Sequence, residues 1–521
     1  MKPVSAVLLG LLLAALPVVL ASVGCGSTKA AADAGPDASG MMLTVMGAQT
    51  PLTPTFSPDI FDYYVRCSAG TNDLTVTMTA AAGGTAQLLE PAPASPAKAS
   101  QSVPIKAAEG SEIEVAFTTG GTTTQYFVRC LPHDFPAFTM TTFPDAGTPA
   151  PGYYLVGPSL VVGCGARAYA MAIDIHGVPV WYEPFGLLNG VEDIESLVPG
   201  TISFDVTLDD NAPFQILTPS TLGTTNVGPT DTDQHELRIS NGNSFVFVYA
   251  TTKGIDLTGL EIADSSADGG FKHLGSNETI QDCEIEELDE SGNTVWTWLM
   301  SDHFDPKQVS LIPSGGFNVP PSDDIYDVFH CNSMDIDPAN GNILVSAAAT
   351  NSIFYVEHSS KKVLWKMGGA NSNKDNARFV TVAGQQFLYE HDARLLPGWS
   401  ASTNGGTGQI SLLDDQFGND NGHPRAVVYD VVVGTGSSNG QAKATWTFSG
   451  SGSTGVGGSF RITPENTRVI GWGLSTPTLQ EVTEGGATLL DFLFPCDSSY
   501  RAVKIPASAF DITTLRNAAG R

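Results

Sequence analysis

A repeated β-rich pattern, opened by a histidine, constrains this chain more than any other feature of its sequence. The clearest copy spans residues 327–369, where His330 and Asn332 belong to an alternating segment whose side chains share one face of a strand. The turn at residues 340–342, Asn-Gly-Asn, has the residue types that accept positive φ in a tight hairpin. Further β-rich runs lead to Trp365. The stretch predicts a four-stranded antiparallel meander.

The same pattern recurs along the chain. His235 opens a second copy ahead of an Asn-Gly-Asn turn at residues 241–243, and His391 opens a third. Four segments end on a tryptophan after a turn: Trp181, Trp296, Trp365 and Trp446. Their spacing fits irregular repeats of about forty to sixty residues, which is typical of β-propeller blades.

In a propeller the three histidines are expected to belong to one site. His235, His330 and His391 occupy the same place in their repeats, so radial symmetry would bring them to one height around the central channel. Asn332 is expected to point the same way as His330 because it follows two residues later on a strand. The arginines three residues after His235 and His391 are expected to face away from the channel, either as ion pairs between blades or as surface residues.

The N-terminus has the features of an exported protein. Residues 1–25 combine an early lysine with a long apolar run, which predicts a signal peptide. The sequence Ser-Val-Gly before Cys25 is similar to a lipobox and predicts lipid attachment at Cys25, with simple secretion as the alternative. Either way we expect a location outside the cytoplasm, on the cell envelope (outer membrane or periplasm) or secreted. Residues 26–41 are small and polar and predict a flexible linker.

Residues 42–135 are expected to form a small β-sandwich. They contain short β-like runs between Gly-, Pro- and Ala-rich loops, and residues 52–64 resemble the opening of cadherin-like repeats of bacterial surface proteins. Two similar sequences end at Cys67 and Cys130, and a disulfide between these cysteines is expected in an oxidising compartment. The spacing leaves open how the other cysteines pair: Cys164, Cys283, Cys331 and Cys496.

Composition and missing motifs exclude several functions. The chain has 54 acidic against 25 basic residues, so nucleic acid is not an expected partner. It has no P-loop, no GxGxxG after a strand, no HExxH and no GxSxG, and we expect no cofactor. The loop at residues 414–422 is rich in side-chain oxygens but lacks the spacing and closing glutamate of an EF-hand.

Three motifs in order carry a family resemblance. They are HxNS at residues 330–333, the WxxGG ending that begins at Trp365, and HDAR at residues 391–394. With these motifs, residues 152–504 resemble the bacterial arylsulfotransferases that work without PAPS. The resemblance implies a six-bladed β-propeller, residues 150–515 here, preceded by a small β-sandwich. It also implies ping-pong transfer of a sulfuryl group from an aryl sulfate to a phenol, with His391 as nucleophile.

The resemblance assigns roles to the other site residues. His330 would act as general acid and base, and His235 with Asn332 would bind the sulfuryl oxygens. Phenols and aryl sulfates would be the partners, and only a lipid anchor would contact a membrane. One position departs from the family, because Ala348 stands where its members usually have an arginine. Two alternatives therefore remain: a non-catalytic ligand-binding propeller, and a metalloprotein whose three histidines bind zinc or copper.

Overall fold

The structure, a computed structural model, describes residues 40–159, 167–186, 190–207, 213–263, 271–310, 325–417, 419, 422–436, 439–452, 457–495 and 498–521. The chain divides into two compact units between Phe135 and Pro136. Both consist mainly of strands, so the prediction of an all-β protein is confirmed. The predicted signal peptide, the lipidation site at Cys25 and the linker up to residue 39 lie outside the described residues, as do Cys164 and Cys496.

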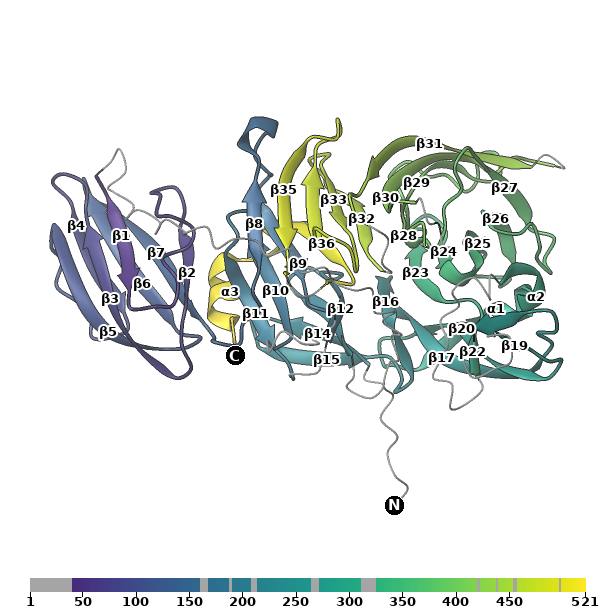
Figure 1. Cartoon of the computed structure of the whole chain (residues 1–521), viewed down its shortest axis with the longest axis horizontal. Helices are drawn as coiled ribbons and strands as arrows, with labels where there is room; N and C mark the ends of the chain where they lie inside the picture. The colour runs from purple at the N-terminus through teal and green to yellow at the C-terminus, as the bar shows by residue number, and fades with distance from the viewer. Residues whose placement is uncertain are drawn as a thin grey trace, which may run out of the picture. The chain divides into compact units, whose positions relative to one another are not determined.

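The first unit contains two sheets that share one apolar core (Figure 1). One sheet has the strand order β1 (Met42–Met46), β3 (Thr71–Thr79) and β5 (Ser100–Ala108). The other has the order β2 (Asp62–Arg66), β7 (Thr122–Leu131), β6 (Glu112–Thr119) and β4 (Thr85–Glu90). Alternate side chains of β3, among them Leu74 and Val76, are buried, so one face of the strand supplies the core.

A disulfide joins Cys67 to Cys130, with their Cα atoms 5.5 Å apart. The two similar sequences that end at these cysteines run side by side, because β2 and β7 are parallel neighbours in one sheet. The bridge therefore links adjacent strands of a single sheet. It closes a long stretch of chain, which restricts the unfolded state.

Within its described residues, the second unit contains six groups of four antiparallel strands, some of which are extended or joined into larger sheets, and we number these groups as sheets in chain order. In chain order, the first three are β36 (Ala502–Pro506), β9 (Gly152–Val156), β10 (Tyr169–Asp174), β11 (Pro179–Pro184); β12 (Gly190–Glu195), β13 (Ile202–Thr207), β14 (Phe214–Thr218), β15 (Gly223–Val227); and β16 (Thr232–Ser240), β17 (Asn243–Ile255), β20 (Glu278–Leu288), β21 (Thr294–Leu299). The next three are β23 (Cys331–Ile336), β24 (Ile343–Ala347), β25 (Ser352–Val356), β26 (Val363–Met367); β28 (His391–Leu395), β29 (Thr407–Asp414), β30 (Arg425–Val432), β31 (Gly440–Ser449); and β32 (Ser459–Ile462), β33 (Arg468–Gly471), β34 (Leu479–Val482), β35 (Thr488–Leu493).

The first strands of these sheets form a closed series. Each of β12, β16, β23, β28, β32 and β36 lies next to the following one, and β36 lies next to β12. The closure depends on the last strand of the chain, because β36 pairs with β9 from the start of the unit (Figure 1). We call β12, β16, β23, β28, β32 and β36 the inner strands.

Additional elements extend the sheets or connect them. The strands are β8 (Thr139–Thr142), β18 (Glu261–Ala263), β19 (Phe271–His273), β22 (Ile325–Asp327) and β27 (Arg378–Ala383). The helices are η1 (Pro144–Ala146), α1 (Met300–His303), α2 (Pro306–Val309), η2 (Ala348–Thr350), η3 (Ala507–Ala509) and α3 (Ile512–Ala518). Strand β27 pairs in parallel with both β26 and β31, which merges the fourth and fifth sheets into one nine-stranded sheet. No helix among the described residues is long and apolar enough to cross a membrane.

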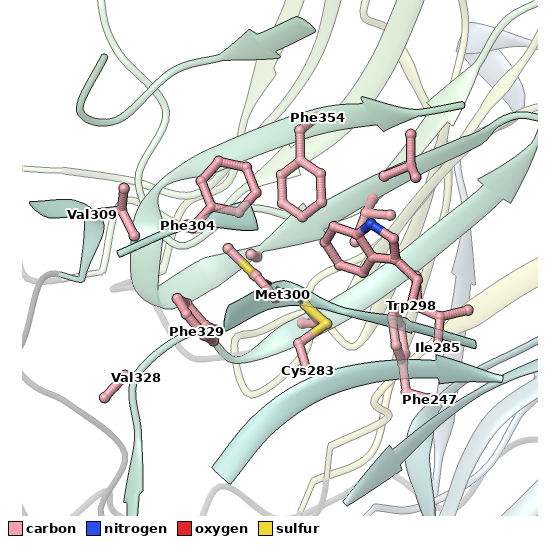
Figure 2. Packing of buried hydrophobic residues seen from close by; sticks show 14 of the residues in the cluster. Phe247, Cys283, Ile285, Trp298, Met300, Phe304, Val309, Val328, Phe329 and Phe354 are labelled. Carbon is pink, nitrogen blue, oxygen red and sulfur yellow. Dashed lines mark hydrogen bonds between the residues drawn. A yellow bond between two sulfur atoms is a disulfide. The ribbon is translucent and has the colours of Figure 1, made fainter. Parts of the chain in front are cut away.

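Large apolar side chains fill the space between neighbouring sheets. Figure 2 shows the cluster between the third and fourth sheets, where Phe354 lies between Trp298 and Phe304, a residue of the α1–α2 connection. The ring centroid of Phe354 is 5.6 Å from that of Trp298 and 5.0 Å from that of Phe304. Aromatic pairs at these distances contribute packing energy beyond their buried area. This packing holds the inner strands β16 and β23 in a fixed relation.

Candidate functional site

The structure brings the three predicted histidines together at the inner strands. His235 lies in β16, His330 directly precedes β23, and His391 begins β28. The rings of His235 and His330 have their centroids 4.9 Å apart. The ring of Tyr500 lies 5.6 Å from that of His235 and 6.1 Å from that of His391, edge to face in both cases. Tyr500 was missed by the sequence analysis because it belongs to no repeat motif.

Carboxylates hold the first two histidines. Nδ1 of His235 is hydrogen-bonded to Asp233, and Nδ1 of His330 lies 2.5 Å from Oδ2 of Asp327. Because a carboxylate accepts, Nδ1 carries the proton in both rings, and Nε2 is left for a ligand. The side chains of His235 and His330 are 11% and 14% exposed, so both imidazoles are desolvated.

His391 is the most deeply buried of the three histidines, with 2% of its side chain exposed. Its Nδ1 donates a hydrogen bond to the carbonyl oxygen of Tyr389 at 3.1 Å. A carbonyl oxygen can only accept, so this contact favours the tautomer that leaves Nε2 unprotonated. Oδ2 of Asp415 is 2.7 Å from the same Nδ1.

The environment separates the pKa values of two of these rings. Burial lowers the pKa of His391 well below its ordinary value, and positive charge on His330 and His235 adds to this effect. Burial also acts to lower the pKa of His330, but the charge and hydrogen bond of Asp327 outweigh it, and the pKa is raised. The site therefore disfavours protonation of the His391 ring and favours protonation of the His330 ring.

Irregular backbone surrounds the histidines. The pairing register shifts in four inner strands, between Glu192 and Glu195, Thr232 and Leu237, Cys331 and Ser333, and His391 and Arg394. His330, Tyr389 and Asp392 have positive φ values of 53°, 54° and 57°. Such bulges and strained residues concentrate next to functional sites, where they redirect side chains. They also break the simple alternation that the sequence analysis assumed.

Asn332 is part of the site but is already engaged with the protein. Its side chain is fully buried, and its Nδ2 donates to the carbonyl oxygen of Glu390 at 2.6 Å. The backbone carbonyl oxygen of Asn332 accepts from the hydroxyl of Tyr500 at 3.2 Å and from Arg501 at 2.9 Å. Asn332 thus ties the inner strand β23 to the segment before His391.

A largely buried network of ion pairs connects five inner strands with Arg501, the residue before β36. Its members are Asp193, Glu195, Glu236, Arg238, Asp335, Asp392, Arg394, Arg461 and Arg501. Arg394 and Arg238, the arginines after His391 and His235, join inner strands as predicted. They do so inside the network and not on an outward face, because the register shifts before them break the alternation.

Ala348 occupies the position where the family usually carries an arginine. Ala348 is buried in η2, and its backbone N–H donates to the carbonyl oxygen of His330 at 2.9 Å. Arg501 lies close by, but Asp193 and Glu236 neutralise its guanidinium. Arg425 is occupied by Asp414 at 2.6 Å.

A second disulfide, whose pairing the sequence left open, lies beside the site. Cys331, the residue after His330, is bonded to Cys283 of β20, with Cα atoms 5.8 Å apart. In Figure 2, Cys283 lies within the apolar cluster between the third and fourth sheets. The bond thus connects the backbone next to His330 to a rigid core.

The described residues give no support to a histidine-bound metal. Their only group of three potential ligands with all ligand atoms within 4.8 Å is Asp193, Glu195 and Glu236. Arg501, Arg394 and Arg238 already compensate these carboxylates. We conclude that the cluster is structural.

Comparison with known proteins identifies the family. The family model for Arylsulfotransferase (ASST) matches residues 220–494, more than half of the chain. No curated protein matches the sequence. Among solved structures, TolB from Acinetobacter baumannii is similar at 9% identity and a TM-score of 0.38, over 77% of this chain and 80% of that one. An auxiliary nutrient binding protein from Bacteroides thetaiotaomicron has 10% identity and a TM-score of 0.31, over 85% and 98%. These structural similarities are too distant to bear on function. The match to the family model, together with the histidine site, shows that the chain belongs to the arylsulfotransferase family.

Proposed function

We propose that this protein is an exported aryl sulfotransferase that moves a sulfuryl group from an aryl sulfate ester to a phenolic acceptor through a sulfohistidine. The six four-stranded sheets are the blades of a β-propeller over residues 150–515, and the inner strands line its channel. The observation that carries the proposal is the convergence of the three histidines around Tyr500, with Nδ1 of His391 bound to the carbonyl oxygen of Tyr389 so that its Nε2 is available.

The chemistry requires both imidazole states. Nε2 of His391 attacks sulfur while the bond to the aryl oxygen breaks, and His330 donates a proton to the departing phenolate. In the second half-reaction His330 takes the proton of the acceptor phenol, which attacks the sulfur and regenerates His391. His235 binds sulfuryl oxygens, and Asn332 supports the site by holding the segment before His391.

The absence of the family arginine is compensated in part by His330. A protonated imidazole supplies a charged donor where the leaving group and sulfuryl oxygens gain negative charge. Removing one preorganised donor typically costs about 3 to 4 kcal/mol of transition-state stabilisation. We therefore expect slow turnover with an activated phenyl ester. The competing function, a ligand-binding propeller without catalysis, is motivated by Ala348 and predicts no transfer at all.

The other parts of the chain serve export and presentation. We assign residues 1–25 to a signal peptide with lipidation at Cys25, residues 26–41 to a linker, and residues 42–135 to a cadherin-like β-sandwich without catalytic function. The two disulfides suit an oxidising compartment outside the cytoplasm.

Intact-mass measurement after brief exposure to 4-nitrophenyl sulfate tests the proposal. The purified protein should gain one sulfuryl group and release nitrophenolate, and His391→Ala should do neither. His273→Ala is the matched control, because that side chain is 79% exposed and remote from the histidine site. Addition of phenol should remove the mass gain. No mass gain and no released phenolate in the parent protein would favour the ligand-binding alternative.

A further inference from the structure

A buried carboxyl group lies directly against the proposed nucleophile. Oδ2 of Asp415 is 2.7 Å from Nδ1 of His391, and each side chain is 2% exposed. Among the described residues this oxygen has no hydrogen-bond partner, because the Nδ1–H donates to the carbonyl oxygen of Tyr389. Leaving a buried acceptor unsatisfied lowers the stability of the fold. The position is therefore maintained at a cost to stability.

The neighbouring acidic groups Asp414 and Glu390 accept hydrogen bonds from other residues, although Oε2 of Glu390 has no partner among the described residues. Asp414 pairs with Arg425 and accepts from the backbone N–H of Leu388 at 2.9 Å. Glu390 accepts from the hydroxyl of Ser346 at 3.2 Å. Burial raises the pKa of Asp415 well above its ordinary value, and negative charge on Asp414 and Glu390 adds to the rise. In the resting site, Asp415 and His391 thus form a neutral pair.

We propose that Asp415 is the positioning residue of the nucleophile: its carboxyl group packs against Nδ1 of His391, which leaves Nε2 free to attack, and it balances the positive charge that the ring gains on sulfation. The inference rests on the proposed function and adds a residue to which neither the sequence motifs nor the repeat pattern pointed. The loop at residues 414–422, noted for its oxygen-rich composition, thereby gains a role that does not involve a cation.

The charges balance through one cycle. Nε2 forms the bond to sulfur, the bond from sulfur to the aryl oxygen breaks, and the phenolic oxygen takes a proton from His330. The ring keeps its proton on Nδ1 and becomes cationic. A cation 2.7 Å away makes the carboxyl group of Asp415 more acidic, so its proton passes to solvent and Nδ1–H then donates to the carboxylate. When the acceptor phenoxide attacks sulfur, the electron pair of the broken bond returns to Nε2, and Asp415 regains a proton.

The test compares Asp415→Asn and Asp415→Glu with the parent protein. Stopped-flow release of nitrophenolate from 4-nitrophenyl sulfate reports formation of the intermediate, and we expect Asp415→Asn to slow it about a hundredfold. Asp415→Glu should recover part of the rate, because it restores a carboxyl group. Asp337→Asn is the matched control, since Asp337 is a buried carboxylate that accepts from Tyr355 at 2.6 Å and contacts none of the three histidines. It should leave the rate unchanged.

Nitrogen-15 NMR of labelled histidine provides a readout that does not depend on turnover. In the parent, His391 should show a protonated Nδ1 and a bare Nε2, and Asp415→Asn should shift protons onto Nε2. An unchanged rate in Asp415→Asn, or an equal loss in Asp337→Asn, would overturn the inference while leaving the proposed function intact. A parent that forms no intermediate would refute the proposed function, and the NMR comparison alone would then decide whether Asp415 positions His391.

Discussion

The imidazole rings of His235 and His330 lie edge to face, with an angle of 80° between their planes. Each is held at Nδ1 by a carboxylate that precedes it closely in sequence, Asp233 or Asp327. The contact exists because β16 and β23 are neighbouring inner strands. Two distant copies of one local motif thus form a single proton-handling unit.

Asp327→Asn should move the pH dependence of the first half-reaction. Asp327 raises the pKa of His330, so the substitution should lower that pKa. As pH rises, His330 should therefore lose its proton earlier in the variant, and the rate should fall at a lower pH than in the parent. The initial rate of nitrophenolate release against pH measures this shift.

The same pair has a linked effect on stability. The pKa of His330 is higher in the folded than in the unfolded state. The contribution of the His330–Asp327 pair to the free energy of unfolding is therefore fully present below the unfolded pKa and is lost as pH rises through the folded pKa. Urea unfolding at several pH values should show the parent losing this increment and Asp327→Asn lacking it. In the rate measurement, a loss of activity at the same alkaline pH in Asp327→Asn as in the parent would contradict the role of His330 as the acid.

Arg501→Met should strongly destabilise the second unit. The side chain is fully buried and pairs with Asp193 and Glu236, so its removal leaves buried charges uncompensated. Breaking such a pair typically costs about 3–5 kcal/mol. The free energy of unfolding in urea measures the loss, with Glu484→Ala as control because Glu484 is 67% exposed. Equal unfolding midpoints for the two variants would show that the network relaxes around the loss.

Loss of the Cys283–Cys331 bond should lower stability without preventing folding. The bond spans a sequence separation of 48 residues, and a closed loop of this size predicts about 4 kcal/mol from restriction of the unfolded chain. The double variant Cys283→Ala, Cys331→Ala should show this loss in denaturant unfolding. Reductant should then have no further effect on the second unit. Further sensitivity to reductant there would indicate an additional bond in that unit.

Gly369→Ala should be more harmful than Gly384→Ala, although both glycines have positive φ. At Gly369 an added Cβ would lie 2.2 Å from the carbonyl oxygen of Thr350, whereas at Gly384 it would meet nothing within 4 Å. We expect Gly384→Ala to lower the free energy of unfolding by about 1 kcal/mol through backbone strain, and Gly369→Ala to lower it by about 3 kcal/mol. Thermal or urea unfolding distinguishes the two. Equal losses would show that strain, and not the clash, makes glycine necessary in the WxxGG motif.

Local sequence determined the strands and their turns. Alternating apolar residues and the Asn-Gly turns predicted the antiparallel meanders, and Asn241 and Gly242 have the expected positive φ values of 52° and 87°. The recurrence of His235, His330 and His391 in phase was also visible, because a repeat fold converts equal phase into spatial proximity. These features depend on contacts between residues near each other in the chain.

Only the tertiary structure decided which side chains meet at the site and in what state of charge. Tyr500, Arg501 and Asp415 belong to no repeat, and they reach the histidines through closure of the ring by β36 and through the turn after β29. The register shifts in the inner strands also replaced alternation with a buried ion network. Burial, which depends on long-range packing, lowers the pKa of His391, and the charges of the distant His330 and His235 add to this effect, whereas the raised pKa of His330 depends mainly on the nearby Asp327. The sequence by itself therefore determined the strands and the candidate histidines, whereas long-range packing determined the chemistry those histidines can perform.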